Sequence, residues 1–253
     1  MDFGVRRIII LINTILFDLD GTMLPLDLDK FLKIYFTEMG KKFHDLIDSK
    51  TLINNIWIAT ETMVNNTDYC TNEQVFMEKF GQLIQGDLLT YQKRFNEFYD
   101  QEFMATKSSV SDSHYMRNSV NLLKIKGYEL VIATNPLFPE KAIHHRIRWS
   151  GFEPEDFIYI TSYEKNHYCK PQLHFYREVL HEIGKAPQEC LMVGNDVQED
   201  LIAGQLGIET FLITDFLIHR TQEPITTTYQ GNYADFYQFV QSLPELNMEQ
   251  KMA

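Results

Sequence analysis

The chain is poor in cysteine and in positive charge. It has 253 residues but only three cysteines, Cys70, Cys169 and Cys190, with no closely spaced pair. An odd number of scattered cysteines argues against a disulfide framework or a zinc site and fits a reducing cytoplasm. Lys and Arg number 23 against 35 Asp and Glu, so the net charge is −12. That charge argues against nucleic acid or an anionic membrane as the partner.

A long apolar run is also lacking. The most apolar stretch, residues 8–17, is interrupted by Asn13 and Thr14 and is too short to span a bilayer. Arg6 and Arg7 precede it, but no small-residue cleavage site follows, so we accept no targeting signal. We therefore interpret residues 1–12 as an N-terminal extension and expect a cytoplasmic protein with no membrane partner.

Two carboxylates follow a short apolar segment near the N-terminus. The apolar run that ends in Ile15–Phe17 predicts a buried strand, and Asp18 and Asp20 come directly after it, before Gly21 and Thr22. Two like charges this close require a cation or a shared proton, and a hard divalent ion such as Mg²⁺ suits carboxylate oxygens. The alternative is an ordinary acidic turn, because Asp and Gly are common in turns.

The segment that follows is helical for a long way. Breaks at Gly40, at residues 65–68 and at Gly86 divide it. The apolar spacing predicts helices at Asp27–Met39, Phe43–Val64, Thr71–Gln85 and Leu89–Met104. Thr71 and Gln74 have the spacing of a capping box. This segment is too long for a simple crossover between strands, so we interpret it as an inserted helical module, with Trp57 in its core.

Helices and strands alternate from about residue 111 onward. Strands are predicted at Tyr128–Ala133, Phe157–Ile160, Cys190–Val193 and Glu209–Ile213. Helices are predicted at Ser113–Lys126, Pro139–Ser150, Gln172–Ile183, Glu199–Leu206 and Asn232–Leu243, with a polar loop over residues 221–230. This alternation is typical of an α/β, Rossmann-like fold with a parallel sheet and helices on both faces.

Polar residues follow several of the predicted strands. They are Thr134 and Asn135, then Asn195 and Asp196 with Asp200 one helical turn later, and Lys170 before Pro171 in a loop. Each alone is as typical of a turn, a helix start or a surface lysine. In parallel α/β sheets the carboxyl ends of the strands form the ligand site, so we expect these groups to converge with Asp18 and Asp20. Together they suit the binding and attack of a phosphoryl group.

The ordered set of motifs resembles the haloacid dehalogenase-like (HAD) hydrolase superfamily. The matching segments are FDLDGT at residues 17–22, VIATN at 131–135, Lys170-Pro171 and VGNDVQED at 193–200. The resemblance implies a core formed by residues 13–25 and 110–243. It also implies that residues 26–109 are a helical cap inserted after the first motif, which leaves 244–253 as a C-terminal tail.

The resemblance implies a role for each motif. Asp18 would be the nucleophile and Asp20 the general acid and then the general base. Lys170 would neutralise developing negative charge. Thr22, Thr134 and Asn135 would bind the substrate. Asp18, Asp20 and the acidic motif, with Asn195, Asp196 and Asp200 as candidates, would hold Mg²⁺.

One departure concerns the acidic motif, where the family often has Gly-Asp and this chain has Gly194-Asn195-Asp196. Either Asn195 offers its amide oxygen at the ligand position beside Asp196, or Asp196 is the ligand and Asp200 orients Lys170 or a metal-bound water. Both alternatives stay open at this point.

The predicted function is a magnesium-dependent phosphatase that acts on a small phosphorylated metabolite. A sugar phosphomutase and a catalytically weak regulatory protein that keeps the phosphate site are the alternatives. Asp20 disfavours a dehalogenase, since carbon-centred chemistry does not require protonation of an alcohol. Substrate specificity is expected to depend on the cap, with Lys30, Tyr35, Trp57 and Arg94 as candidates.

Overall fold

The computed structural model describes residues 12–246, and the predicted extension and tail therefore lie largely outside the described residues. Within this range six parallel strands form one sheet in the order β3-β2-β1-β4-β5-β6. The strands are β1 Thr14–Phe17, β2 Glu129–Ile132, β3 Tyr159–Ile160, β4 Cys190–Gly194, β5 Glu209–Ile213 and β6 Tyr229–Gly231. This architecture confirms the α/β prediction.

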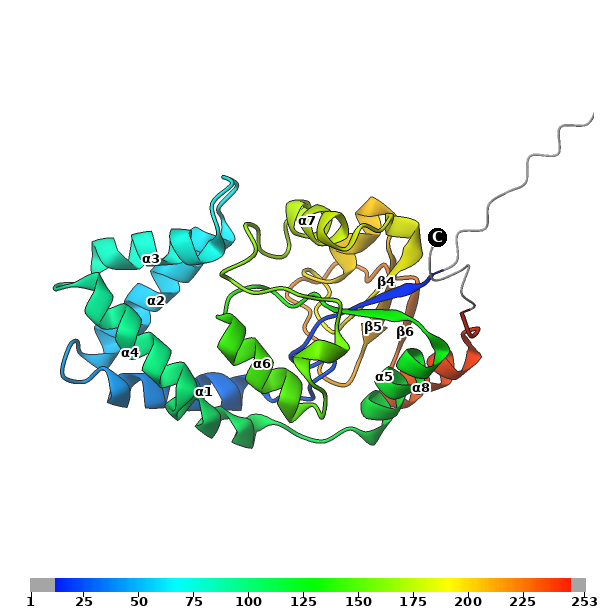
Figure 1. The fold of residues 1–253 in the computed structure, drawn as a ribbon, viewed down its shortest axis with the longest axis horizontal. Helices are drawn as coiled ribbons and strands as arrows, with labels where there is room; N and C mark the ends of the chain where they lie inside the picture. Colours follow the sequence, from blue (N-terminus) through cyan, green and yellow to red (C-terminus); the bar gives the residue numbers. More distant parts are fainter. Residues whose placement is uncertain (1–11, 247–253) are drawn as a thin grey trace, which may run out of the picture.

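Each face of the sheet is covered by helices (Figure 1). Side chains alternate along β1, so Ile15 and Phe17 pack in one apolar cluster and Leu16 in another. The first cluster includes residues of α5 (His114–Lys126), α6 (Glu140–Trp149) and α8 (Tyr233–Ser242), and the second includes residues of α7 (Leu173–Ile183) and the 3₁₀ helix η4 (Leu201–Leu206). Burial on both faces explains why the strands are continuously apolar.

Four further helices lie together at one end of the molecule, away from most of the sheet (Figure 1). They are α1 Leu28–Lys42, α2 Ser49–Val64, α3 Asn72–Leu83 and α4 Leu88–Asp100. Each begins where a side chain accepts a hydrogen bond from the first turn, and the predicted capping box of Thr71 and Gln74 is present. The boundaries of the predicted cap stay a prediction. None of the helices described in residues 12–246 combines the length and the apolar character that crossing a bilayer requires.

Two of the predicted helices in this module are wrong at their ends. The helix predicted over 43–64 begins only at Ser49, because Asp48 accepts a hydrogen bond from the N–H of Thr51 and caps it there. The helix predicted over 89–104 ends at Asp100, and a 3₁₀ helix, η1 Glu102–Ser109, follows. Both errors have one cause, which is that apolar residues keep their helical spacing beyond the residue where the helix begins or ends.

Two predictions near the C-terminus differ in type. The predicted helix 199–206 is the 3₁₀ helix η4. The predicted loop 221–230 contains the start of β6, an edge strand with mostly exposed side chains. Such a strand pairs with β5 through its backbone, so its sequence carries no apolar signal.

The ends of the central strands are level with one another. The N–H of Asp18 donates to the carbonyl of Val193 at 2.9 Å, and the N–H of Ala133 donates to the carbonyl of Phe17 at 2.7 Å. The residues that follow β1, β2 and β4 therefore meet at one edge of the sheet, where parallel sheets bind their ligands.

Candidate active site

The turn after β1 presents two carboxylates at the sheet edge. Gly21 has a φ of +79°, a left-handed conformation that favours glycine. A Cβ at this position would lie 2.4 Å from Nδ2 of Asn195, which is closer than packing allows. Glycine therefore lets the turn reverse while Asn195, from the far side of the site, packs directly against it.

Lys170 lies between two of the predicted acidic residues. Its ammonium donates to Oδ1 of Asp18 at 3.0 Å and to Oδ1 of Asp200 at 2.6 Å, from a side chain that is 1% exposed. Burial alone lowers the pKa of Lys170, but the two carboxylates outweigh burial and hold that pKa well above its ordinary value. Lys170 is therefore a fixed cation beside Asp18.

Asp200 faces Lys170 and the backbone. Its Oδ2 accepts a hydrogen bond from the N–H of Asp196 at 2.9 Å, so Lys170 and the backbone each bind one of its oxygens. Burial raises the pKa of Asp200, while the Lys170 ammonium opposes that rise. This arrangement favours the alternative in which Asp200 orients Lys170 over one in which Asp200 holds a metal directly.

Asp20 has an unexpected partner, Arg146 of α6. The Arg146 guanidinium donates to Oδ2 of Asp20, although the Arg146 side chain is only 1% exposed, and it lies 4.5 Å from the ring centre of Phe138. Oδ1 of Asp20 is buried and has no hydrogen-bond partner among the described residues. Burial raises the pKa of Asp20, and the Arg146 charge partly opposes this.

The sequence motifs do not point to Arg146, although one signal exists. Arg146 follows Ala142 and Ile143 and precedes Ile147 on one helix face, and these three apolar residues are fully buried. A charged residue in such a stripe requires a buried partner. The pattern could have revealed a buried ion pair but not the identity of its partner.

Asn195 and Asp196 bind groups from different parts of the chain. Oδ1 of Asn195 accepts from the Thr22 hydroxyl at 2.9 Å, and its Nδ2 donates to the carbonyl of Phe216 at 2.6 Å. Arg220 donates to Oδ1 and Oδ2 of Asp196 at 2.7 and 2.6 Å. Thr22 was predicted to bind substrate, but its hydroxyl bonds Asn195.

The residues predicted after β2 have separate surroundings. Oδ1 of Asn135 accepts from the N–H of Lys170 at 3.2 Å, and Nδ2 donates to Glu199 at 3.0 Å. Asn135 therefore links the lysine loop to the acidic motif. Thr134 is buried, and its carbonyl accepts from the hydroxyl of Thr161 at 2.7 Å.

A cavity of about 540 Å³ opens at this edge of the sheet. Its wall includes Asp18, Asp20, Thr134, Asn135, Asn195 and Asp196 from the predicted set. Glu199, which lies in the acidic motif but was not predicted as a site residue, also lines it, as do Arg146 and Arg220, which lie in no motif. The lysine, Lys170, reaches the cavity only through Asp18. The structure thus brings the predicted groups to one site and adds two arginines.

The oxygen groups of this site fit Mg²⁺ in chemical type. Among residues 12–246, no three His, Cys, Asp or Glu side chains are grouped as a metal site, so amide or backbone oxygens would have to contribute. Asp18, Asn195 and Asp196 line one cavity, and only one oxygen of Asp18 is bound by Lys170. Hard oxygen donors of this kind suit Mg²⁺, with Arg220 as a competitor for Asp196.

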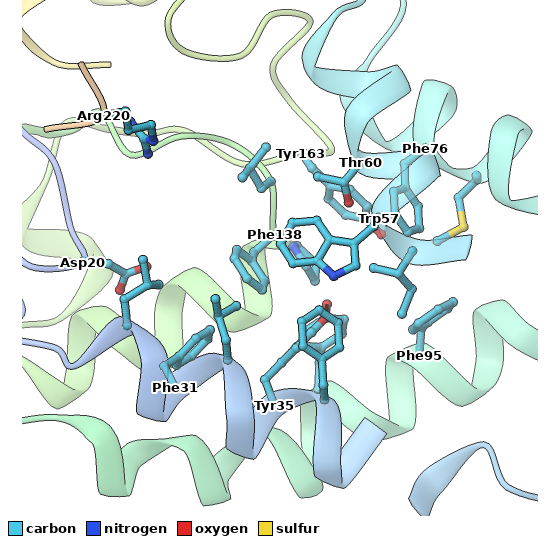
Figure 2. A pocket seen from close by; sticks show the side chains of 18 residues that line it. Asp20, Phe31, Tyr35, Trp57, Thr60, Phe76, Phe95, Phe138, Tyr163 and Arg220 are labelled. Atoms are coloured by element: carbon cyan, nitrogen blue, oxygen red, sulfur yellow. Dashed lines mark hydrogen bonds between the residues drawn. The ribbon is translucent and has the colours of Figure 1, made fainter. Parts of the chain in front are cut away.

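A second cavity of about 280 Å³ adjoins the first (Figure 2). Both are lined by Asp20, Leu28, Leu137, Phe138 and Arg220. Of the four predicted specificity residues, Tyr35 and Trp57 line it, whereas Lys30 donates to the Ser108 carbonyl and Arg94 pairs with Asp45. The assignment of Trp57 to the core is wrong, because its side chain is 50% exposed at the cavity.

The profile of the haloacid dehalogenase-like hydrolase family matches residues 12–207, more than half of the chain. The chain belongs to this family of hydrolases. The match includes all of the motif residues of this HAD-like hydrolase, from Asp18 to Asp200. A comparison of its sequence with curated proteins gave no match.

Solved structures with the same fold include proteins with different chemistry. A HAD phosphatase from Thermococcus onnurineus has a TM-score of 0.59 and 14% identity, with 93% of this chain and 100% of that chain covered. L-2-haloacid dehalogenase from Xanthobacter autotrophicus has a TM-score of 0.55 and 14% identity, with 92% and 100% covered. The HAD-hydrolase YfnB from Bacillus subtilis, bound to magnesium, has a TM-score of 0.56 and 19% identity, with 91% and 99% covered. At such identities the likeness shows the shared fold alone.

Proposed function

We propose that this HAD-like hydrolase is a magnesium-dependent phosphatase that hydrolyses a small phosphomonoester through an aspartyl-phosphate on Asp18. The observation that carries the proposal is the buried Lys170 ammonium between Asp18 and Asp200. Such a fixed cation orients one oxygen of Asp18 and neutralises the negative charge that develops during attack, and a carboxylate can serve as the nucleophile of covalent catalysis. Arg146 and Arg220 add positive charge around the cavity where a phosphoryl group would bind.

In the first half of the reaction, an Asp18 oxygen attacks phosphorus and the bond from phosphorus to the leaving oxygen breaks. Asp20 donates a proton to that oxygen, so an alcohol leaves. Oδ1 of Asp20 would carry the proton, since Arg146 binds Oδ2, and because Oδ1 is buried the carboxyl group would turn to present it to the leaving oxygen. The raised pKa of Asp20 supports this role, because the protonated form then persists closer to neutral pH.

In the second half, Asp20 has lost its proton and accepts one from water. The water oxygen attacks phosphorus, the bond to Asp18 breaks, and inorganic phosphate leaves with Asp18 restored. Magnesium, when bound, neutralises charge on the phosphoryl oxygens. Asp18, the Asp20 carbonyl, and either Asn195 or Asp196 would hold it, while Thr134 would contact the phosphoryl group.

Two properties of relatives agree with the proposal without deciding it. One solved neighbour is a HAD phosphatase and another is bound to magnesium. A third is a dehalogenase, which raises the alternative of attack at carbon. The second aspartate, Asp20, favours phosphatase chemistry, because an alcohol leaving group must gain a proton whereas a halide need not.

The test is hydrolysis of p-nitrophenyl phosphate and acetyl phosphate with Mg²⁺, with release of inorganic phosphate as the readout. We expect Asp18→Asn and EDTA each to abolish turnover, and the exposed Asp100→Asn to leave it unchanged. Undiminished activity in EDTA or in Asp18→Asn would refute the mechanism. Chloride release from 2-chloropropionate without phosphatase activity would instead identify a dehalogenase.

Two further outcomes would favour the other predicted functions. Interconversion of sugar phosphates without net release of phosphate would favour a phosphomutase. Tight binding of a phosphoester or a protein partner with no turnover of any phosphoester would favour a regulatory protein.

A further inference from the structure

We infer that the second cavity binds the leaving group of the substrate, and that this group is an apolar, ring-bearing alcohol. This inference rests on the proposed phosphatase function, since it extends the same site. The evidence is the position, size and lining of the cavity, which together restrict the chemistry of what it can hold.

The position of the cavity follows from its shared wall. Asp20 and Phe138 line both cavities, so the second begins where the leaving oxygen would receive its proton. Figure 2 shows Asp20 and Phe31 toward one end and Phe76 and Phe95 toward the other, with Trp57 between them. A group bonded to the leaving oxygen would extend away from Asp20 along this space.

The lining is aromatic. Nine of the eighteen lining residues are Phe, Tyr or Trp, and the remainder are mostly aliphatic. The rings of Phe31 and Phe138 meet edge to face with their centres 6.0 Å apart. The ring centres of Trp57 and Phe36 are 5.7 Å apart. Such a lining favours a ligand that presents a flat apolar surface, because two aromatic rings in contact gain free energy beyond that of the apolar area they bury.

The lining also lacks the charges that a polar metabolite would need. Among its described residues only Asp20 and Arg220 are charged, and both also belong to the first cavity. The hydroxyls of Tyr35 and Tyr99 bond each other at 2.8 Å, and burial raises the pKa of Tyr35 to about 12, so it is neutral. Away from Arg220, a second phosphate or a row of sugar hydroxyls would be buried here with too few hydrogen-bond partners, at a high cost.

The size of the cavity limits the ring system. A cavity of roughly 150 Å³ lined by apolar side chains can hold benzene. The 280 Å³ of this cavity is about twice that, which suits one substituted ring or two fused rings. The hydroxyls of Thr60 and Tyr163 would offer hydrogen bonds to one or two polar substituents of the ring.

The experiment compares phosphates whose leaving groups are all primary alcohols, so that only the attached group differs. We expect kcat/KM for benzyl and 2-naphthylmethyl phosphate to exceed that for glycerol 3-phosphate at least about tenfold. Trp57→Ala should remove most of this preference, and Trp57→Phe should retain it. Leu89→Ala, which changes an exposed residue of α4 outside the lining, should leave the preference unchanged.

A second measurement does not depend on turnover. Calorimetry with 2-naphthalenemethanol and the Asp18→Asn variant should show binding that Trp57→Ala weakens about tenfold. Hydrolysis of acetyl phosphate without any preference among the alcohols, and without binding of the naphthyl alcohol, would overturn the inference and leave the phosphatase function intact. Binding of the alcohol without hydrolysis of any phosphoester would overturn the function and support the assignment of the cavity.

Discussion

Arg146 donates a hydrogen bond to Asp20 from a side chain that is almost completely buried. The proposed acid and base of the reaction is thus held by a cation on a helix that follows the second motif. Because Arg146 binds Oδ2 and leaves Oδ1 without a partner among the described residues, it determines which oxygen can carry the proton.

Arg146→Met should shift the pH dependence of turnover. Loss of the guanidinium removes the interaction that lowers the pKa of Asp20, so this pKa rises further. A smaller fraction of Asp20 is then deprotonated at each pH, and the acidic limb of the kcat profile should move to higher pH. The measurement is kcat for p-nitrophenyl phosphate as a function of pH, and an unmoved limb would contradict the role of Arg146.

The same variant should unfold more easily at neutral pH. Loss of the Arg146 cation should cost up to about 3 kcal/mol, the lower end of the range for fully buried pairs, because the Asp20 side chain is 24% exposed. In the folded variant the pKa of Asp20 lies above the ordinary value of 3.8 that it has in the unfolded chain. Stability therefore falls as pH rises from the lower of these two values to the higher. Urea unfolding should therefore show a smaller deficit near pH 4 than near pH 7. Arg148→Met, on the same helix but exposed and paired with Glu153, is the matched control and should change stability by less than about 0.5 kcal/mol.

Lys170→Met should destabilise the fold as well as abolish activity. It leaves the carboxylates of Asp18 and Asp200 buried without their shared cation, at a cost of about 3–5 kcal/mol. The exposed Lys165→Met, which removes a surface pair with Glu140, should cost less than about 1 kcal/mol. Equal urea midpoints for the two variants would show that the buried cation has no structural role.

Arg220→Gln should strengthen the binding of Mg²⁺ in the absence of substrate. Arg220 donates to both oxygens of Asp196, which are candidate metal ligands, so the guanidinium competes with the ion. Removal of a half-exposed ion pair worth roughly 1 kcal/mol corresponds to about fivefold tighter binding. Calorimetric titration with magnesium chloride measures this, with the exposed Arg177→Gln as control. Unchanged or weaker binding would mean that Asp196 is not a ligand.

Asn195→Asp should destabilise this protein, although the family often has aspartate in this motif. The amide of Asn195 donates to the Phe216 carbonyl at 2.6 Å, and a carboxylate cannot donate that bond. The resulting contact between two acceptors should cost about 1–3 kcal/mol in the free energy of unfolding. Added Mg²⁺ should recover part of this loss if residue 195 is a metal ligand, which a thermal melt with and without the ion tests.

Much of the sheet and the site could be predicted because each strand is buried on both faces and ends in polar residues. Asp18, Lys170 and Asp200 come from three separate motifs, and the level ends of β1 and β4 bring two of them together. The helix ends were less predictable, since apolar spacing continues past the cap at Asp48.

The partners of these residues were not predictable for a physical reason. Arg146 lies on a helix that contains none of the motifs. Only its proximity to Asp20 in the folded chain gives it a role. Arg220 lies just before the predicted polar loop, in a segment to which no role was assigned, and this segment returns to the sheet edge through the bond between the Ile218 N–H and the Asn195 carbonyl. Tertiary contacts of this kind leave no periodic trace along the chain.

The central position of β1 has a consequence for how the active site is made. The nucleophile loop is near the start of the chain, but its neighbours β2 and β4 follow more than a hundred residues later, and Lys170 is 152 residues from Asp18. Contacts of such sequence separation form slowly, because a long loop must close first. During synthesis, helices α1–α4 emerge early and can pack against one another at once. The catalytic groups meet only after most of the chain has left the ribosome.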